Sequence, residues 1–94
     1  MGTFHQGKHE LHGITVVVET AGPELYVGRC DDITETRVIL LDVDLHRDGV
    51  DEGTRADWLA NAAKFGVWKK HDRLVLPRPQ VTSVRPLGSV ESAD

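Results

Sequence analysis

Residues 11–43, LHGITVVVETAGPELYVGRCDDITETRVILLDV, decide the fold that this chain adopts. Three runs rich in β-branched residues are separated by two short polar connections, which is the pattern of strands joined by turns. The predicted strands are residues 11–20, 25–30 and 37–43, with connections at 21–24 and 31–36. In the first strand, Ile14, Val16 and Val18 share one face. We therefore expect a bent antiparallel meander.

A helix is predicted beyond an acidic, glycine-containing loop at residues 44–53. Thr54 can cap the first backbone amides, Asp57 lies where a carboxylate favours a helix start, and Gly66 ends the helix. The predicted helix therefore spans residues 54–65. Its apolar residues recur at intervals of three to four, which predicts a single buried face formed by Trp58, Leu59, Ala62, Ala63 and Phe65.

Two short strands are predicted near the end of the chain, at residues 73–76 and 81–85. Pro77 and Pro79 lie between them and cannot donate a hydrogen bond to a sheet, so they force a tight corner. The predicted organisation is a flexible arm, a single domain and a disordered polar tail, at residues 1–10, 11–86 and 87–94 respectively.

The size and composition of the chain argue against several classes of protein. With 94 residues, a large substrate cleft would compete with the core for residues. The sequence contains no nucleophile elbow, phosphate-binding glycine loop or dinucleotide fingerprint, so we expect neither an enzyme nor a cofactor. A single cysteine, Cys30, suits a reducing compartment, and no apolar run is long enough to span a membrane. We expect a soluble cytoplasmic protein.

The net charge of −4 is distributed unevenly along the chain. Residues 1–63 carry five Lys or Arg and twelve Asp or Glu, whereas residues 64–86 carry six Lys or Arg and one Asp. A basic segment of this kind can mark a nucleic-acid face. The preferred interpretation is that acidic and basic surfaces complement each other within or between subunits, because overall acidity opposes nonspecific phosphate binding.

The pattern resembles the Sm/LSm family, which includes the bacterial Sm-like RNA chaperones. The resemblance rests on Leu11-x-Gly13-x-x-Val16-x-Val18, Leu25–Gly28, Val38–Asp42 and Leu74–Val81, and it covers residues 11–43 and 73–85. It implies a mainly β fold, namely an Sm-like (SH3-type) five-stranded bent β-barrel, with the helix inserted between the third and fourth strands. It also implies a homo-oligomer in the form of a closed ring of about five to eight copies.

The positions at which the family reads uridine differ in this chain. Counting from Gly28, the family's Asp falls at Thr34 and its Asn at Val38, whose side chain has no hydrogen-bonding group. The Arg-Gly of the second family motif is replaced by Pro77-Arg78 or Arg78-Pro79. We therefore expect any RNA to contact a different surface.

Aromatic and cationic side chains in and near the basic segment are the candidates for that surface. Trp68 can stack a base and its cationic neighbours can hold phosphate. The candidate RNA-binding residues are Arg37, Trp68, Lys69, Lys70, Arg73 and Arg78. The preferred alternative for Trp68 is that it packs under the inserted helix, with the neighbouring lysines in water.

The sequence gives only weak signals for a metal site or a reactive cysteine. His5, His9 and His12 would share a face of a helix and bind zinc or nickel, but a mobile polar arm is preferred and no metal site is predicted. The run Asp44-x-His46-x-Asp48-Gly49 is similar to the start of a calcium loop, whose twelfth position needs Glu and here has Arg55. Cys30 has acidic neighbours that would raise its pKa, so a buried structural thiol is expected.

These observations predict a ring-forming binding or scaffold protein without catalytic activity, which contacts protein partners or possibly RNA. One alternative is an RNA-binding Sm-like ring that uses residues 64–86 in place of the uridine pocket. The other is a monomeric SH3-like interaction module.

Overall fold

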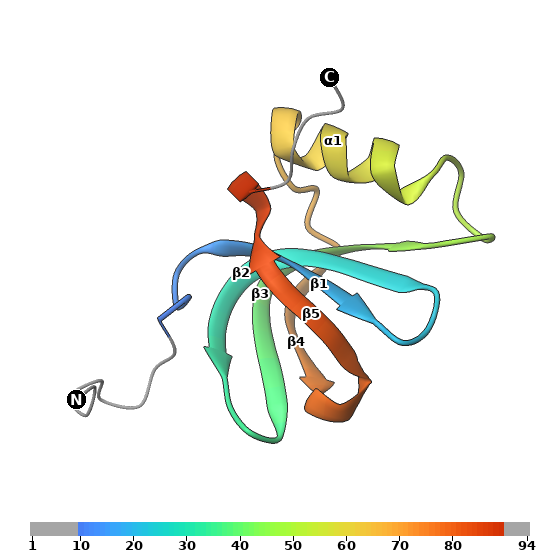
Figure 1. Ribbon diagram of the computed structural model, residues 1–94. Helices are drawn as coiled ribbons and strands as arrows, with labels where there is room; N and C mark the ends of the chain where they lie inside the picture. Colours follow the sequence, from blue (N-terminus) through green and yellow to red (C-terminus); the bar gives the residue numbers. More distant parts are fainter. Residues whose placement is uncertain (1–9, 90–94) are drawn as a thin grey trace.

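The structure, a computed structural model, describes residues 10–89, and within them it contains the predicted elements in the predicted order. The strands are β1 (Thr15–Thr20), β2 (Glu24–Ile33), β3 (Arg37–Arg47), β4 (His71–Pro77) and β5 (Val81–Pro86). They form one antiparallel sheet in the order β4-β3-β2-β1-β5, and α1 (Arg55–Phe65) lies between β3 and β4 in sequence. Figure 1 shows the strands curving around a common interior, with α1 at one end. The mainly β, Sm-like bent barrel is confirmed.

The curvature of the sheet comes from irregularities in β2 and β3. The pairing of these strands shifts between Val27 and Arg29 and again between Cys30 and Asp32, which lets a strand bend. Gly28 lies at the first shift, where an added Cβ would come within 3.1 Å of the Leu41 carbonyl oxygen. On β3, Asp42 has a φ of +53°, which lies in the left-handed region. A side chain at position 28 would therefore crowd β3 at the bend.

Two apolar clusters pack against opposite faces of β1, because successive strand residues point in opposite directions. Val16 and Val18 belong to the cluster inside the barrel, together with Cys30, Val38, Leu40, Val43 and Leu76. Val17 belongs to the cluster under α1, together with Leu25, Val27, Leu59 and Leu87. The prediction that Ile14 shares the buried face is wrong, because it precedes β1 and is 41% exposed.

Several element boundaries differ from the prediction, among them the end of β2, which continues to Ile33, and the start of β4 at His71. The first strand begins at Thr15, because residues 11–14 form a turn closed by a hydrogen bond from Ile14 N–H to the Leu11 carbonyl. The third strand continues to Arg47, so the loop predicted from residue 44 starts later. Asp44 and His46 look like loop residues in the sequence, but both are buried in β3.

The predicted flexible arm and disordered tail, at residues 1–10 and 87–94, lie mostly outside the described residues. Leu87–Ser89 form a short 3₁₀ helix, η2, in which Leu87 is buried against the cluster under α1, so the disorder expected from residue 87 does not begin there. An apolar contact with Leu59 and Val17 is what holds this turn in place. The arm predicted at residues 1–10 lies outside the described residues except for Glu10, and residues 90–94 of the predicted tail also lie outside them.

Helix α1 begins and ends as predicted. The Thr54 hydroxyl accepts a hydrogen bond from Asp57 N–H at 3.1 Å, and Gly66, with φ +96°, ends the helix by donating to the Ala62 carbonyl. Its predicted buried face is confirmed in part: Leu59 is buried, and Trp58 and Ala62 pack partly buried against the same cluster. Ala63 and Phe65 were also predicted to be buried, but both are exposed, Phe65 by 70%. The helix covers one end of the barrel and not the breadth of a sheet face, so it has little to pack against (Figure 1).

Candidate functional site

The six candidate RNA-binding residues lie at two separate places on the barrel. Arg37 and Arg78 lie at the end opposite α1, where Figure 1 shows the β2–β3 turn beside η1 (Arg78–Gln80). Arg78 fastens this corner, because its backbone N–H donates to the Thr36 carbonyl at 2.9 Å and its Nη1 donates to the Thr34 carbonyl at 3.0 Å. The Arg78 guanidinium is thus held at the turn next to which Arg37 begins β3.

The other four candidates lie in the connector after α1 and at the start of β4. Arg73 stands opposite Leu41 and is four residues from Pro77, the partner of Arg37, which places the two arginines about 13 Å apart along the strands. Lys70 N–H donates to the Val43 carbonyl at 2.8 Å and fixes the connector to β3. The structure therefore does not bring the six candidates together.

Three cations of the basic segment, Lys69, Lys70 and Arg85, are paired with carboxylates of the same chain. Lys69 Nζ lies 2.9 Å from Asp72 Oδ1 and 3.9 Å from Asp42 Oδ1. The hydrogen bond between Lys69 and Asp72 raises the pKa of the lysine and lowers the pKa of the carboxyl group. Lys70 Nζ lies 3.1 Å from Asp44 Oδ1. These contacts agree with the interpretation that acidic and basic surfaces complement each other within the subunit.

Other cations remain available to a partner. Within residues 10–89, the cations that form no ion pair are Arg37, Arg47, Lys64, Arg73 and Arg78, and all of them are exposed. Trp68 is 79% exposed, so the prediction that it packs under α1 is wrong. The indole face of Trp68 is open to a ligand.

The residues at the family's uridine-reading positions have structural roles here. Thr34 Oγ1 accepts hydrogen bonds from the backbone N–H groups of Thr36 and Arg37, at 3.2 Å and 3.1 Å, and so closes the β2–β3 turn. Val38 is fully buried in the barrel interior. Neither side chain is placed to read a base edge.

A hollow between α1 and the connector is a feature that the sequence reasoning missed. It has a volume of about 550 Å³ and is lined by Asp44, Trp58, Asn61, Ala62, Phe65, Gly66 and Trp68. The available signal was the spacing of three aromatic residues around a helix-ending glycine. That signal was missed because Trp58 and Phe65 were assigned to a buried helix face.

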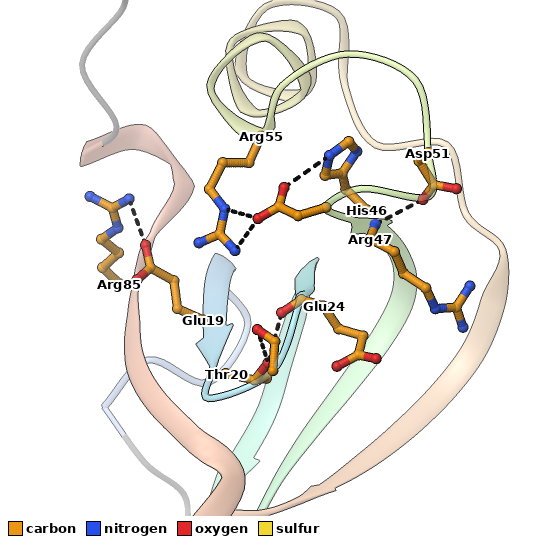
Figure 2. Close-up of polar contacts among 10 residues, drawn as sticks. Glu19, Thr20, Glu24, His46, Arg47, Asp51, Arg55 and Arg85 are labelled. Carbon is orange, nitrogen blue, oxygen red and sulfur yellow. Dashed lines mark hydrogen bonds and ion pairs between the residues drawn. The ribbon is translucent and has the colours of Figure 1, made fainter.

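A chain of polar contacts supports the wall of this hollow. Arg55 donates to Asp48 Oδ2 from Nε at 2.9 Å and approaches it with Nη2 at 2.7 Å, while His46 Nε2 lies 3.3 Å from Asp48 Oδ1 (Figure 2). The bond from Arg55 is the main cause that lowers the pKa of Asp48. The buried His46 ring lies 5.6 Å, centroid to centroid, from the ring of Trp58.

The calcium-like run does not converge on a common point. Asp44 contacts Lys70, whereas Asp48 contacts Arg55 and His46, so both carboxylates already face cations of the chain. His12 Nδ1 lies 2.6 Å from the Asp31 carbonyl oxygen, and His5 and His9 lie outside the described residues. In the part of the chain that is described, no three His, Cys, Asp or Glu residues are arranged to hold a metal ion.

Two further positions bear on the class of protein. Cys30 is 1% exposed inside the barrel, as expected for a structural thiol. Among residues 10–89, no helix has the length and apolar character needed to cross a membrane.

Comparisons with known proteins support the fold. No protein-family model and no curated protein matches the sequence. The structure is similar to that of a Pyrococcus abyssii Sm protein in complex with a uridine heptamer, with a TM-score of 0.58 and 19% identity over 83% of this chain and 89% of that one. It is also similar to a chain of the NatC complex bound to CoA, with a TM-score of 0.51 and 13% identity over 79% of this chain and 75% of that one. At these identities the likeness concerns architecture, and the chain has the Sm-like fold.

Proposed function

We propose that this chain is a non-catalytic binding or scaffold protein that assembles into a closed ring and contacts protein partners, with RNA as the second candidate partner. The observation that carries the proposal is the order of the sheet, in which β4 and β5 are the two end strands. An end strand presents unpaired backbone groups to any strand that can align with it. Pairing β4 of one copy with β5 of the next is a head-to-tail contact, and such contacts form a ring when the rotation from copy to copy closes.

An exposed apolar residue on β4 supports this assembly. Leu74 and Leu76 pack into the barrel interior, so Val75 points to the outer face of β4, where it is 39% exposed. A second copy aligned along β4 would cover it and remove its apolar surface from water. The resemblance to Sm-like proteins implies about five to eight copies in such a ring.

Native mass spectrometry of the purified protein tests the ring. We expect the wild-type protein to appear as one closed oligomer and Val75→Lys to appear mainly as monomer, because a charged side chain on an edge strand opposes pairing. Val50→Lys is the matched control, since Val50 is 73% exposed in the loop before α1, and it should leave the oligomer intact. A wild-type monomer at micromolar concentration would favour the SH3-like interaction module.

Protein partners are preferred over RNA because the residues at the family's uridine-reading positions, and Lys69 and Lys70, already make contacts within the chain. Val38 is buried, Thr34 closes a turn, and Lys69 and Lys70 face carboxylates of their own chain. The buried position of Cys30 supports a protein without catalytic activity and is compatible with a reducing cytoplasmic location.

RNA binding is the second candidate, favoured by Arg37 and Arg78. Both are exposed, form no ion pair within residues 10–89 and lie at the same turn. In a ring, every copy would add this pair to one annular cationic surface. The nucleic-acid content of the purified oligomer, measured by its absorbance ratio and by nuclease digestion, distinguishes this candidate from a ring that contacts proteins alone.

A further inference from the structure

The hollow beside α1 gathers most of the aromatic surface of the chain in one place. The sequence contains two Trp, two Phe and one Tyr, and both tryptophans and Phe65 line this hollow. Its volume of about 550 Å³ is within the range of small-ligand sites.

The walls of the hollow are fixed by hydrogen bonds and packing. Gly66 N–H donates to the Ala62 carbonyl at one end of the connector, and Lys70 N–H donates to the Val43 carbonyl at the other. Trp58 is half-buried beside the ring of His46, which the chain of contacts to Asp48 and Arg55 supports from behind. A site of this kind requires little reorganisation when a ligand enters.

The open aromatic faces favour a flat ring as the ligand. Trp68 is 79% exposed and Phe65 is 70% exposed, which leaves large apolar surfaces in water. Aromatic side chains on a surface are well suited to stack a planar heterocycle, because both partners lose water-exposed area while keeping their edges hydrogen-bonded. Asn61 adds an amide that can both donate and accept a hydrogen bond at the edge of such a ring.

Asp44 is the one charged residue that lines the hollow, and its charge is already balanced by a cation of the chain. Asp44 is only 7% exposed, and its carboxylate already accepts from Leu45 N–H at 2.8 Å and faces Lys70 Nζ at 3.1 Å. Lys64 Nζ lies 5.4 Å from the centre of the Phe65 ring. Lys64 lies outside the lining, next to Phe65, and it forms no ion pair within residues 10–89, so it is the cation offered to a phosphate at the rim. The negative end of the α1 dipole opposes this attraction.

We propose that this hollow binds a nucleotide, with the base stacked against Trp68 and Phe65 and the phosphate directed to Lys64. The same chemistry is offered by a mononucleotide and by one nucleotide of a single-stranded RNA. This site goes beyond the proposed ring and is separate from the Arg37–Arg78 corner.

The two indole N–H signals in a ¹H–¹⁵N spectrum of the full-length protein report on the site, since both tryptophans line it. AMP is titrated first, and we expect saturable shifts of both signals. Trp68→Ala should weaken AMP binding at least about tenfold, followed at the Trp58 signal, while Trp68→Phe should retain most of it. Lys64→Gln should weaken AMP binding but leave adenosine binding unchanged. Arg47→Gln, which removes an exposed cation outside the hollow, is the matched control and should bind as wild type.

The source of the nucleotide is distinguished by comparing AMP with oligo(A). Much tighter binding of oligo(A), lost in Trp68→Ala, identifies a nucleotide within RNA, and equal affinities identify a mononucleotide. The proposal is overturned if neither AMP nor oligo(A) shifts the indole signals at millimolar concentration, or if Trp68→Ala binds AMP as well as wild type. It is also overturned if tetramethylammonium binds more tightly than AMP, because the hollow would then be a cation site. None of these results depends on whether the ring forms.

Discussion

The Asp48 carboxylate connects the end of β3 to the start of α1. It contacts Arg55 at the start of α1 and His46 at the end of β3, and His46 in turn lies beside Trp58. The acidic loop expected from the sequence is therefore partly a connection between strand and helix. What a local pattern could not reveal is that the carboxylate has a guanidinium partner seven residues away.

The stability that Asp48 provides should depend on pH. Arg55 lowers its pKa below the usual 3.8, so the ionised carboxylate favours the folded state, fully above that value and progressively less as the pH falls through and below it. We expect Asp48→Asn to lower the melting temperature at neutral pH and the difference from wild type to shrink below pH 3.8. Thermal unfolding monitored by circular dichroism at several pH values measures this.

Glu52→Gln is the control for this prediction, because Glu52 is exposed in the same loop. It should change the melting temperature little at any pH. A difference between wild type and Asp48→Asn that stays constant down to the most acidic conditions would contradict the role given to the Arg55 bond.

At the scale of elements, α1 is attached to the barrel by a narrow contact. Leu59 is its one buried residue, packed against the cluster that contains Val17 and Leu87. Helices are stabilised mainly by such tertiary packing, so an isolated helix of this length would be marginal. The helix should therefore open locally while the sheet stays folded.

Leu59→Ala tests this local opening. We expect the substitution to destabilise the packing of the helix by roughly 2–4 kcal/mol and to speed amide hydrogen exchange in α1, with the protection of β1 and β2 unchanged. Phe65→Ala removes a larger side chain from the same helix, but one that is exposed, and should leave exchange in α1 close to wild type. Faster exchange throughout the sheet in Leu59→Ala would show that α1 and the barrel unfold together.

The strands were predictable where the pattern is local and not where long-range contacts decide. Alternating apolar residues and turn residues predicted the meander, and the two prolines predicted the corner at η1. The last part of β3 was mistaken for a loop because Asp44 and His46 are polar. A polar side chain is buried only when it has a partner, and the partner of Asp44, Lys70, is 26 residues further along the chain. The helix was predicted from its caps, but its periodicity did not reveal how little of its surface meets the barrel.

At the scale of the whole molecule, many of the basic residues form ion pairs with acidic residues of the same chain. Arg29, Arg55, Lys69, Lys70 and Arg85 each face a carboxylate of the same chain. The contact between Arg85 and Glu19 joins β5 to β1 (Figure 2). Acidic and basic residues that are far apart in the sequence thus lie next to each other in the folded chain. Among the candidate RNA-binding residues, the arginines that form no ion pair within residues 10–89 remain available to RNA.

The salt dependence of RNA binding separates these two groups of cations. If the ring binds RNA, Arg37→Ala and Arg78→Ala should each flatten the slope of log affinity against log salt by about one unit. Lys69→Ala/Lys70→Ala should leave the slope near wild type and lower the melting temperature, because Asp42, Asp44 and Asp72 lose their partners. Oligo(U) binding by fluorescence anisotropy at two salt concentrations measures both. A slope changed only by the lysine variant would place the phosphates on the connector instead.

The position of β1 between β2 and β5 has a consequence for the chain as it is made on the ribosome. Glu19 of β1 and Arg85 of β5 are 66 residues apart. At a synthesis rate of roughly 5–20 residues per second, β5 is therefore made several seconds after β1, with which it pairs. During that interval the nascent meander exposes the edge of β1 that β5 later covers. Because β5 is one of the two end strands of the sheet, the ring proposed above can form through it only after residue 86 has left the exit tunnel.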